Sequence, residues 1–481
     1  MSVLQWRRGL PHIDWTQVAT RYLPFADAAS PDLPLPRLVR LALFQVSVGM
    51  ATALLVGTLN RVMIVELGVG AWLVALMVAL PLVAAPFRAL IGLKSDLHRS
   101  FLGWKRVPFI WAGTLMQFGG LAIMPFALIL LSGQGTVQLV AGHAAAALAF
   151  VLAGAGLQTT QTAGLALATD LAREEQRLRV VALMYVMLLV GMVGASLVYG
   201  LVLADYSNTR LVQVVQGTAV VTVLLNMVAA WKQEPRNSLR AKSPPPRESF
   251  RVHWQRFAAG GRVVRFLVAV GLGTAAFNMQ DVILEPYGGE VLGLAVGATT
   301  QLTALSAIGA LIAFGLAATW LARGADPHRV AATGLLAGVV AFSAVIFAEP
   351  LGVPMLFRGG AALIGFGGGL FAVGTLTAAM SLDSGGLNGL VLGAWGAVQA
   401  TCAGVAVALG GALHDGIAAA ARSGWLGDAM LGAAPAYATV YHLELLLLFA
   451  TLAVLGPLVR RGRLAHAHTP TGRFGLADLP G

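Results

Sequence analysis

The chain has 481 residues, of which 57% are hydrophobic and 11% are charged, and its mean hydropathy is +0.78. Soluble domains carry roughly a quarter of charged residues, so this composition excludes a soluble fold of this length. The net charge of +11 is better explained by basic loops beside anionic lipid than by a nucleic-acid partner, and we expect no nucleic-acid binding.

Apolar runs of about 20 residues, long enough to cross a bilayer as helices, occur twelve times. Helices are expected rather than β-strands, because backbone groups in lipid must be satisfied within the segment and these runs are too long and too uniformly apolar for barrel strands. We therefore predict an all-α polytopic membrane protein with twelve transmembrane helices. The expected spans are 41–60, 71–92, 107–132, 139–168, 180–203, 211–231, 263–284, 295–321, 330–348, 354–379, 389–413 and 436–459.

Residues 1–37 precede the first span and contain several aspartates and prolines, without the short apolar core and cleavage site of a signal peptide. We interpret them as a cytoplasmic segment that lies on the bilayer, with Trp6 and Trp15 as interface anchors.

The longest polar stretch, 232–262, separates the sixth span from the seventh and has the prolines and charges of a cytoplasmic linker. Six spans, a basic linker and six more spans is the layout of transporters built from two parallel repeats. The expected organisation is a segment at 1–37, a six-helix bundle at 38–231, the linker at 232–262, a second six-helix bundle at 263–459 and a cytoplasmic tail at 460–481.

Short matches at equivalent places support this repeat. Ser-Asp-Leu-His-Arg at 95–99 follows the second span, and Ala-Asp-Pro-His-Arg at 325–329 follows the eighth. Asp170 follows the fourth span, and Asp383 follows the tenth.

Lysines and arginines are distributed unequally between the two sides. With an even number of spans both termini share a side, which carries 27 of these residues, whereas the opposite side carries only 3 (Arg61, Arg210 and Arg422). Because cytoplasmic loops carry the excess of positive charge, both termini are predicted to be cytoplasmic.

The loop between the second and third spans resembles the cytoplasmic signature of the major facilitator superfamily. The matching residues are Gly92, Asp96, Arg99, Lys105 and Arg106. One interpretation is a charged latch in which Asp96 caps a helix and pairs across the cytoplasmic gate. The other is that these charges only direct topology.

The expected spans of the second half carry more polar residues than those of the first, where only Arg88 and His143 are ionisable. Spans with so few ionisable residues argue against ordinary ion-coupled transport of a polar solute. In the second half, spacing of i, i+3 and i+7 would place Asn278, Asp281 and Glu285 on one helix face.

Arg358 and Glu444 complete this polar cluster, and a buried Arg358 would need a carboxylate partner. The cluster is interpreted as structural ion pairing, as a pigment or partner site, or as a proton pathway.

No nucleophile elbow, P-loop or Cys–His pair is recognisable, and Cys402 is the single cysteine. We therefore do not expect an enzyme.

Several longer strings resemble one family within this superfamily, the bacteriochlorophyll delivery family of purple photosynthetic bacteria, with its PucC and LhaA types. The most specific is Met-Gln-Asp-Val-Ile-Leu-Glu-Pro-Tyr-Gly-Gly-Glu at 279–290. The others are at 23–30, 44–50, 57–68 and 88–126, and the resemblance covers roughly residues 20 to 460.

This resemblance implies a factor that assembles light-harvesting antenna in the intracytoplasmic photosynthetic membrane, a part of the bacterial inner membrane. It would deliver bacteriochlorophyll to newly inserted antenna polypeptides or chaperone their oligomerisation, with the core antenna favoured over the peripheral one. Expected partners are antenna polypeptides, the reaction centre–antenna complex, pigment-synthesis enzymes and membrane lipids. The alternatives are a chaperone without pigment and an alternating-access transporter of a tetrapyrrole, lipid or other solute.

A bacteriochlorophyll cargo would need an axial ligand to its magnesium, for which imidazole and amide oxygen are suitable. The candidates within the spans are His143, His414, His442, Gln158, Gln161, Gln280, Gln301 and Gln399. We favour His143 and His442, followed by Gln158 and Gln161, which share one face of the fourth span. The competing interpretation is that these residues make interfacial or interhelical hydrogen bonds. No other metal site is expected.

Overall fold

The computed structural model describes residues 28, 33–83, 104, 106–133, 135–173, 176–234, 261–381, 388–427 and 430–459. The regular structure of these residues is entirely helical. The segment at 1–27, most of the 92–106 loop, most of the linker and the tail after 459 lie outside the described residues.

The first half begins with one long helical rod. It comprises α2 (Leu35–Thr52), a π-helical stretch (Ala53–Thr58), α3 (Leu59–Arg61) and a second π-helical stretch (Val62–Glu66). The remaining helices are α4 (Ala71–Val83), α6 (Val107–Leu131), α7 (Thr136–Leu171), α8 (Arg177–Val202) and α9 (Asn208–Ala230).

The second half begins with a broken rod. It comprises α11 (Gly261–Asn278), a 3-10 turn (Met279–Val282) and α12 (Leu284–Glu290). The remaining elements are α13 (Val296–Ala322), α14 (Pro327–Ala348), α15 (Pro354–Ser381), α16 (Asn388–Arg422), α17 (Ala434–Leu455) and a 3-10 turn (Gly456–Leu458).

Eleven helical rods in the described part of the chain are long and apolar enough to cross a membrane. The predicted second span corresponds to α4, whose apolar part is shorter and ends where the description stops. The predicted fold class, an all-α membrane protein with two six-helix halves, is therefore confirmed. The first rod extends beyond the predicted 41–60 span to Glu66, so Arg61 lies within a helix and not in a loop.

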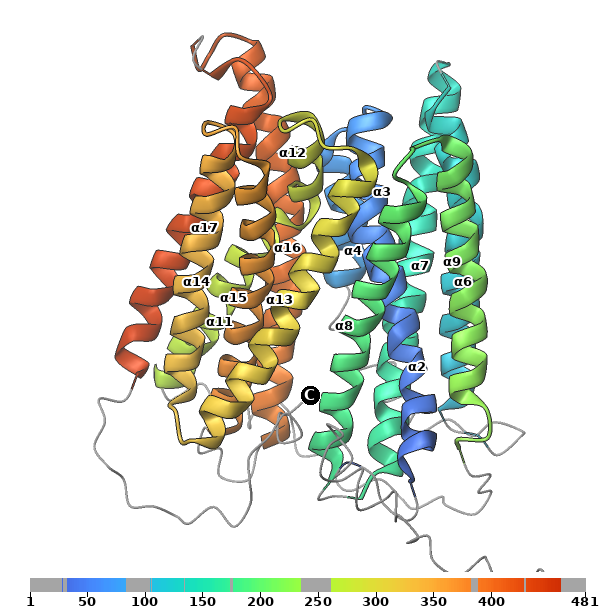
Figure 1. The fold of residues 1–481 in the computed structure, drawn as a ribbon, viewed down its shortest axis with the longest axis vertical. Coiled ribbons are helices and arrows are strands. Elements are labelled where there is room, and N and C mark those ends of the chain that lie inside the picture. Colours follow the sequence, from blue (N-terminus) through green and yellow to red (C-terminus); the bar gives the residue numbers. More distant parts are fainter. Residues whose placement is uncertain are drawn as a thin grey trace, which may run out of the picture.

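The two halves stand side by side in Figure 1, the first in blue and green and the second in yellow to red. We call the end where α2 and α6 begin the linker end, and the opposite end, where α12 and the 349–353 turn lie, the far end. The far end is uppermost in Figure 1.

Glycines allow close helix contacts within each half. A Cβ at Gly120 of α6 would lie 2.5 Å from the Ala149 carbonyl oxygen of α7. In the second half, a Cβ at Gly334 of α14 would lie 2.5 Å from the Gly367 carbonyl oxygen of α15. Since lipid supplies no hydrophobic drive between helices, such close backbone packing is a main source of their association.

Candidate functional site

The seventh span breaks after Asn278, immediately before the most family-specific string at 279–290. A 3-10 turn follows α11, and α12 then carries Pro286, which has no N–H to donate. Because a 3-10 turn has three residues per turn instead of 3.6, the register between Asn278, Asp281 and Glu285 differs from that of one continuous α-helix. The expected single face of three residues is therefore not formed, because Asn278 and Asp281 line one cavity whereas Glu285 lies elsewhere.

Asn278 and Asp281 line a cavity of about 270 Å³ inside the second half. Gln280 Nε2 donates to Asp281 Oδ1 at 2.6 Å, whereas Gln280 Oε1 is buried without a hydrogen-bond partner among the described residues. The same is true of the Thr274 hydroxyl. Ser306 and Gln399 add polar groups to the lining, so the cavity is suited to a small polar ligand or to water.

The Glu285 side chain does not line this cavity and contacts other residues. It is buried, and its Oε1 accepts a 2.6 Å hydrogen bond from the Thr303 hydroxyl of α13. A Cβ at Gly57 of the first rod would lie 2.7 Å from the same Oε1. Glu285 therefore lies where the first half contacts the broken span.

Asn60 makes a second contact between the halves. Its Nδ2 donates to the backbone oxygens of Asp281 at 3.1 Å and Val282 at 3.4 Å, at the 3-10 turn. The hydroxyl oxygens of Thr58 and Thr300 lie 3.4 Å apart. We call this junction, between 57–66 of the first half and 279–303 of the second, the far-end seam.

Arg61 is the buried charge of the far-end seam. Its guanidinium lies 2.5 Å from Glu66 Oε1 and donates to the Leu294 backbone oxygen at 3.4 Å. A Cβ at Gly289 would lie 2.7 Å from Arg61 Nη2. The length of the first apolar run places Arg61 in a loop, so this role is not evident from hydropathy. The pattern that points to it is the family-specific string at 57–68, which contains both Arg61 and Glu66.

Arg358 and Glu444, the other members of the polar cluster, are not paired. Arg358 is half-buried near the far end of α15 and forms no ion pair with a described residue, contrary to the expected carboxylate partner. Its partial exposure removes the need for one. Glu444 is fully buried in α17.

The two candidate histidines lie in different halves and are not brought together. His442 is exposed on α17, and its Nδ1 donates to the Ala438 backbone oxygen at 2.6 Å. In the neutral imidazole, Nε2 then keeps the lone pair that a magnesium ligand requires. His143 is half-buried on α7, in the first half.

The candidate glutamines lie in the middle of α7. Gln158 is buried, and its Oε1 has no hydrogen-bond partner among the described residues. Gln161 is half-buried one turn further along. The unpaired amide oxygen of Gln158 is a suitable ligand by chemistry, but Gly154, one turn earlier, packs against Pro81 of α4, so this part of α7 faces a neighbouring helix.

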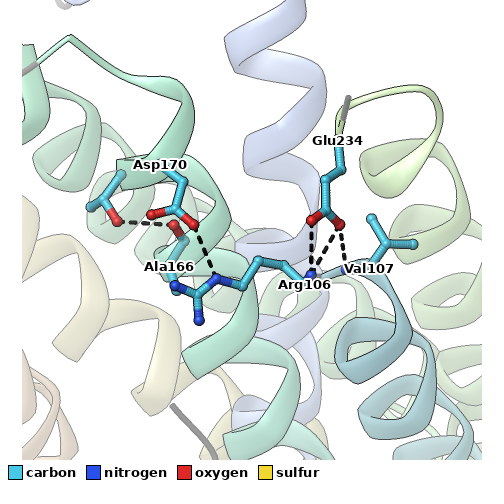
Figure 2. Close-up of polar contacts among 6 residues, drawn as sticks. Arg106, Val107, Ala166, Asp170 and Glu234 are labelled. Atoms are coloured by element: carbon cyan, nitrogen blue, oxygen red, sulfur yellow. Dashed lines mark hydrogen bonds and ion pairs between the residues drawn. The ribbon is translucent and has the colours of Figure 1, made fainter. Parts of the chain in front are cut away.

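At the linker end, Arg106 is the one residue of the predicted gate motif that the structure describes; Gly92, Asp96, Arg99 and Lys105 lie outside the described residues. Figure 2 shows Arg106 Nε donating to Asp170 Oδ2 at 3.0 Å. Asp326, which the short sequence match pairs with Asp96, caps α14 by accepting from the His328 N–H at 3.0 Å.

Glu234 caps the beginning of α6 in the same region. Its carboxylate accepts from the backbone N–H groups of Arg106, at 3.0 Å, and Val107, at 2.9 Å (Figure 2). A carboxylate satisfies the unpaired N–H groups of a helix N-terminus and interacts favourably with the helix dipole. The beginning of the polar stretch at 232–262 is therefore attached to the first half.

Comparison with known proteins identifies the family. The model of the PUCC protein family matches residues 58–463. A protein of the puhA-bchM intergenic region of Rhodobacter capsulatus is 54% identical over 467 residues, covering 96% of this chain and 98% of that protein. Protein PucC of Rhodovulum sulfidophilum is 54% identical over 407 residues, covering 83% and 89%.

A more distant relative, the bacteriochlorophyll synthase 44.5 kDa chain of Rhodobacter capsulatus, is 29% identical over 453 residues, covering 90% and 97%. Among solved structures, the nucleoside transporter NupG superposes with a TM-score of 0.66 at 14% identity, over 87% of this chain and 99% of that one. This likeness shows the fold of major-facilitator transporters. The chain itself belongs to the PUCC protein family, a photosynthesis-related family of membrane proteins.

Proposed function

We propose that this protein is a non-enzymatic assembly factor for the light-harvesting antenna, which delivers bacteriochlorophyll to newly inserted antenna polypeptides or chaperones their assembly. The observation that carries the proposal is membership of the PUCC family over residues 58–463, together with PucC relatives above 50% identity. The core antenna is the proposed client in preference to the peripheral one.

The exposed side chain of His442 fits a pigment cargo. Its Nδ1 proton is used by the Ala438 carbonyl oxygen, so the imidazole presents Nε2 from the surface of α17. The magnesium of bacteriochlorophyll, when bound, would accept this nitrogen as its axial ligand. A pigment held on an exposed helix surface can pass sideways to another membrane protein without crossing the bundle.

The proposed partners are antenna polypeptides, the reaction centre–antenna complex and the enzymes that make the pigment. The proposed location is the intracytoplasmic photosynthetic membrane, with both termini in the cytoplasm. The support for this orientation is the distribution of 27 basic residues on the side of the termini against 3 on the other.

The test uses a pigment-making photosynthetic host that lacks its own copy of the gene. We expect the full chain to restore antenna absorption and, after affinity purification, to carry bacteriochlorophyll and antenna polypeptides. A colourless protein that still binds antenna polypeptides would support a chaperone without pigment. Failure to restore the antenna would reject the assembly function.

The cavity beside Asp281 favours a second function, transport by alternating access. It is polar, lies inside the half-bundle next to the broken span, and occurs in a fold shared with transporters. This function predicts solute uptake into vesicles that falls at least about tenfold in Asp281→Asn, because a polar group in the transport path binds the solute or ion. Uptake unchanged in Asp281→Asn would exclude that role for the cavity.

A further inference from the structure

A groove of about 960 Å³ lies at the far end and is not lined by His143, His442, Gln158 or Gln161, the favoured pigment ligands. It is bordered by the beginning of α4 in the first half, and by Glu290 and the facing ends of α16 and α17 in the second. Its lining includes Trp72, His414, Asp415 and Leu431. Ligand pockets of drug size have volumes of about 300–1,000 Å³, so the groove can accept a large ligand.

His414 is the buried polar side chain of this groove, with 8% of its surface exposed. Its Nδ1 lies 2.9 Å from Asp415 Oδ1, and since a carboxylate only accepts, Nδ1 carries the proton. In the neutral imidazole Nε2 then keeps its lone pair, and it makes no hydrogen bond with any described residue. Histidines that bind metals usually donate their other N–H to a carboxylate in this way, which sets the tautomer and the ring orientation.

Two further contacts hold the imidazole in place. The Tyr437 ring packs against it with centroids 4.2 Å apart, and the Tyr437 hydroxyl donates to Glu290 Oε2 at 2.9 Å. On the other side, Asp415 Oδ2 accepts from the Trp72 backbone N–H at 2.9 Å, in the first turn of α4. The histidine is therefore positioned by residues from both halves.

The number of protein ligands in the groove indicates which kind of metal it can bind. A free metal ion needs three or four protein ligands, and the described residues contain no group of three His, Cys, Asp or Glu side chains arranged for one. A single oriented imidazole suits a metal whose other positions are already filled, such as the magnesium at the centre of a tetrapyrrole. Exposed apolar side chains around the groove, Trp72 and Leu431, suit the flat apolar face of such a macrocycle.

We propose that the far-end groove binds a magnesium tetrapyrrole with His414 Nε2 as the axial ligand and Asp415 as its positioning residue. The inference rests on the proposed pigment-delivery function and names its site. Because Asp415 is held by Trp72 of the other half, separation of the halves at the far end would release the carboxylate and loosen the imidazole. Binding and release of the pigment would then follow closure and opening of the far end.

The test is a titration of the purified full chain in detergent with bacteriochlorophyll a, and in parallel with magnesium-free bacteriopheophytin a. Absorption and resonance Raman spectra report magnesium coordination. We expect the wild type to prefer the magnesium pigment, His414→Ala to lose this preference, and added imidazole to restore it. Asp415→Asn should weaken binding about 10- to 100-fold, the usual effect of losing such a carboxylate. His442→Ala tests the alternative ligand on α17. Arg210→Leu, which lies outside the groove lining, is the control and should bind as the wild type does.

Size-exclusion profiles and thermal unfolding establish that each variant is folded, and imidazole rescue of His414→Ala does so directly. Loss of binding in His442→Ala but not in His414→Ala would overturn the assignment and leave pigment delivery standing. No preference for the magnesium pigment in the wild type would also overturn it. Restoration of the antenna in the gene-deleted host is scored separately, so a protein that restores the antenna without binding pigment rejects the groove assignment and not the assembly function.

Discussion

Buried polar side chains join the two halves at the far-end seam. Asn60 donates to backbone oxygens that the 3-10 turn of the seventh span leaves without helical partners, and Arg61 pairs with Glu66 while contacting the Leu294 backbone. In a membrane these groups have no water to replace a lost partner, so each contact is costly to remove. Both residues are therefore expected to contribute to stability.

Replacing Arg61 by leucine should lower the free energy of unfolding by about 2–3 kcal/mol, because it removes a buried cation and its contacts at the seam. Arg210→Leu is the matched control. Arg210 is 42% exposed and pairs with an exposed Asp205, so its loss should change stability by less than about 1 kcal/mol. Thermal or denaturant unfolding in detergent measures both, and equal effects would show that the buried position of Arg61 is unimportant.

Neighbouring glycines in α6 differ in what surrounds them. Gly120 faces α7, where a Cβ would lie 2.5 Å from both the Ala149 oxygen and the Ala153 nitrogen. Gly119 has no heavy atom within 4 Å of the same position. One glycine is therefore required for helix contact, whereas the other only adds flexibility to the helix.

Gly120→Ala should destabilise the protein by about 1–3 kcal/mol, because backbone atoms of α7 must move away. Gly119→Ala should be neutral or stabilising by up to about 1 kcal/mol, because alanine has the higher helix propensity. Unfolding of the two variants in the same detergent gives the comparison. A Gly120→Ala protein as stable as Gly119→Ala would mean that α6 and α7 do not pack this closely.

The break in the seventh span determines the surroundings of several polar residues. Its 3-10 turn exposes backbone oxygens to Asn60, places Asp281 beside the cavity of the second half and leaves Glu285 beside Gly57 of the first. A straight helix would have aligned Asn278, Asp281 and Glu285 on one face instead. The interruption thus connects the interior of the second half to the far-end seam.

Considered as a whole, the molecule has two half-bundles that meet at the far end through the far-end seam and the Trp72–Asp415 contact. Transport by alternating access requires this end to open, and so would release of pigment from the far-end groove, whereas lateral delivery of pigment from an exposed ligand such as His442 does not. Whether the seam must separate therefore distinguishes a static scaffold from both mechanisms that open the far end.

A cross-link across the seam distinguishes them. In a Cys402→Ala background, Thr58→Cys and Thr300→Cys should be joined by a short bifunctional thiol reagent, because the native hydroxyl oxygens are 3.4 Å apart. A static scaffold should still restore the antenna when cross-linked. Loss of that activity, regained on cleavage of the linker, would show that opening is required. Each single-cysteine protein treated with the same reagent is the control.

The orientation in the membrane has its own test. Leu351→Cys, exposed in the far-end turn, and Arg323→Cys, exposed at the linker end, are compared in the same Cys402→Ala background. We expect an impermeant thiol reagent added to spheroplasts to label Leu351→Cys and to spare Arg323→Cys. The opposite result would place the termini outside the cytoplasm.

The fold class and the candidate family were predictable from sequence because they depend on local properties. The length and composition of each apolar run decide whether it crosses the membrane, and short strings such as 279–290 carry the family resemblance. The unpaired Arg358 and the longer first helix were not predictable in this way, since apolar-run length says nothing of polar residues that extend a helix or of their exposure.

The contacts of the candidate sites depended on packing between segments far apart in the chain. Asn60 meets Asp281 across 221 positions, and Trp72 meets Asp415 across 343, and no local pattern specifies either pairing. A helix break changes the direction of every side chain after it, as Glu285 shows. Local hydrophobicity therefore determined that this is a twelve-span, two-half membrane protein, whereas the packing of the two halves decided which polar groups share a groove, a cavity or a seam.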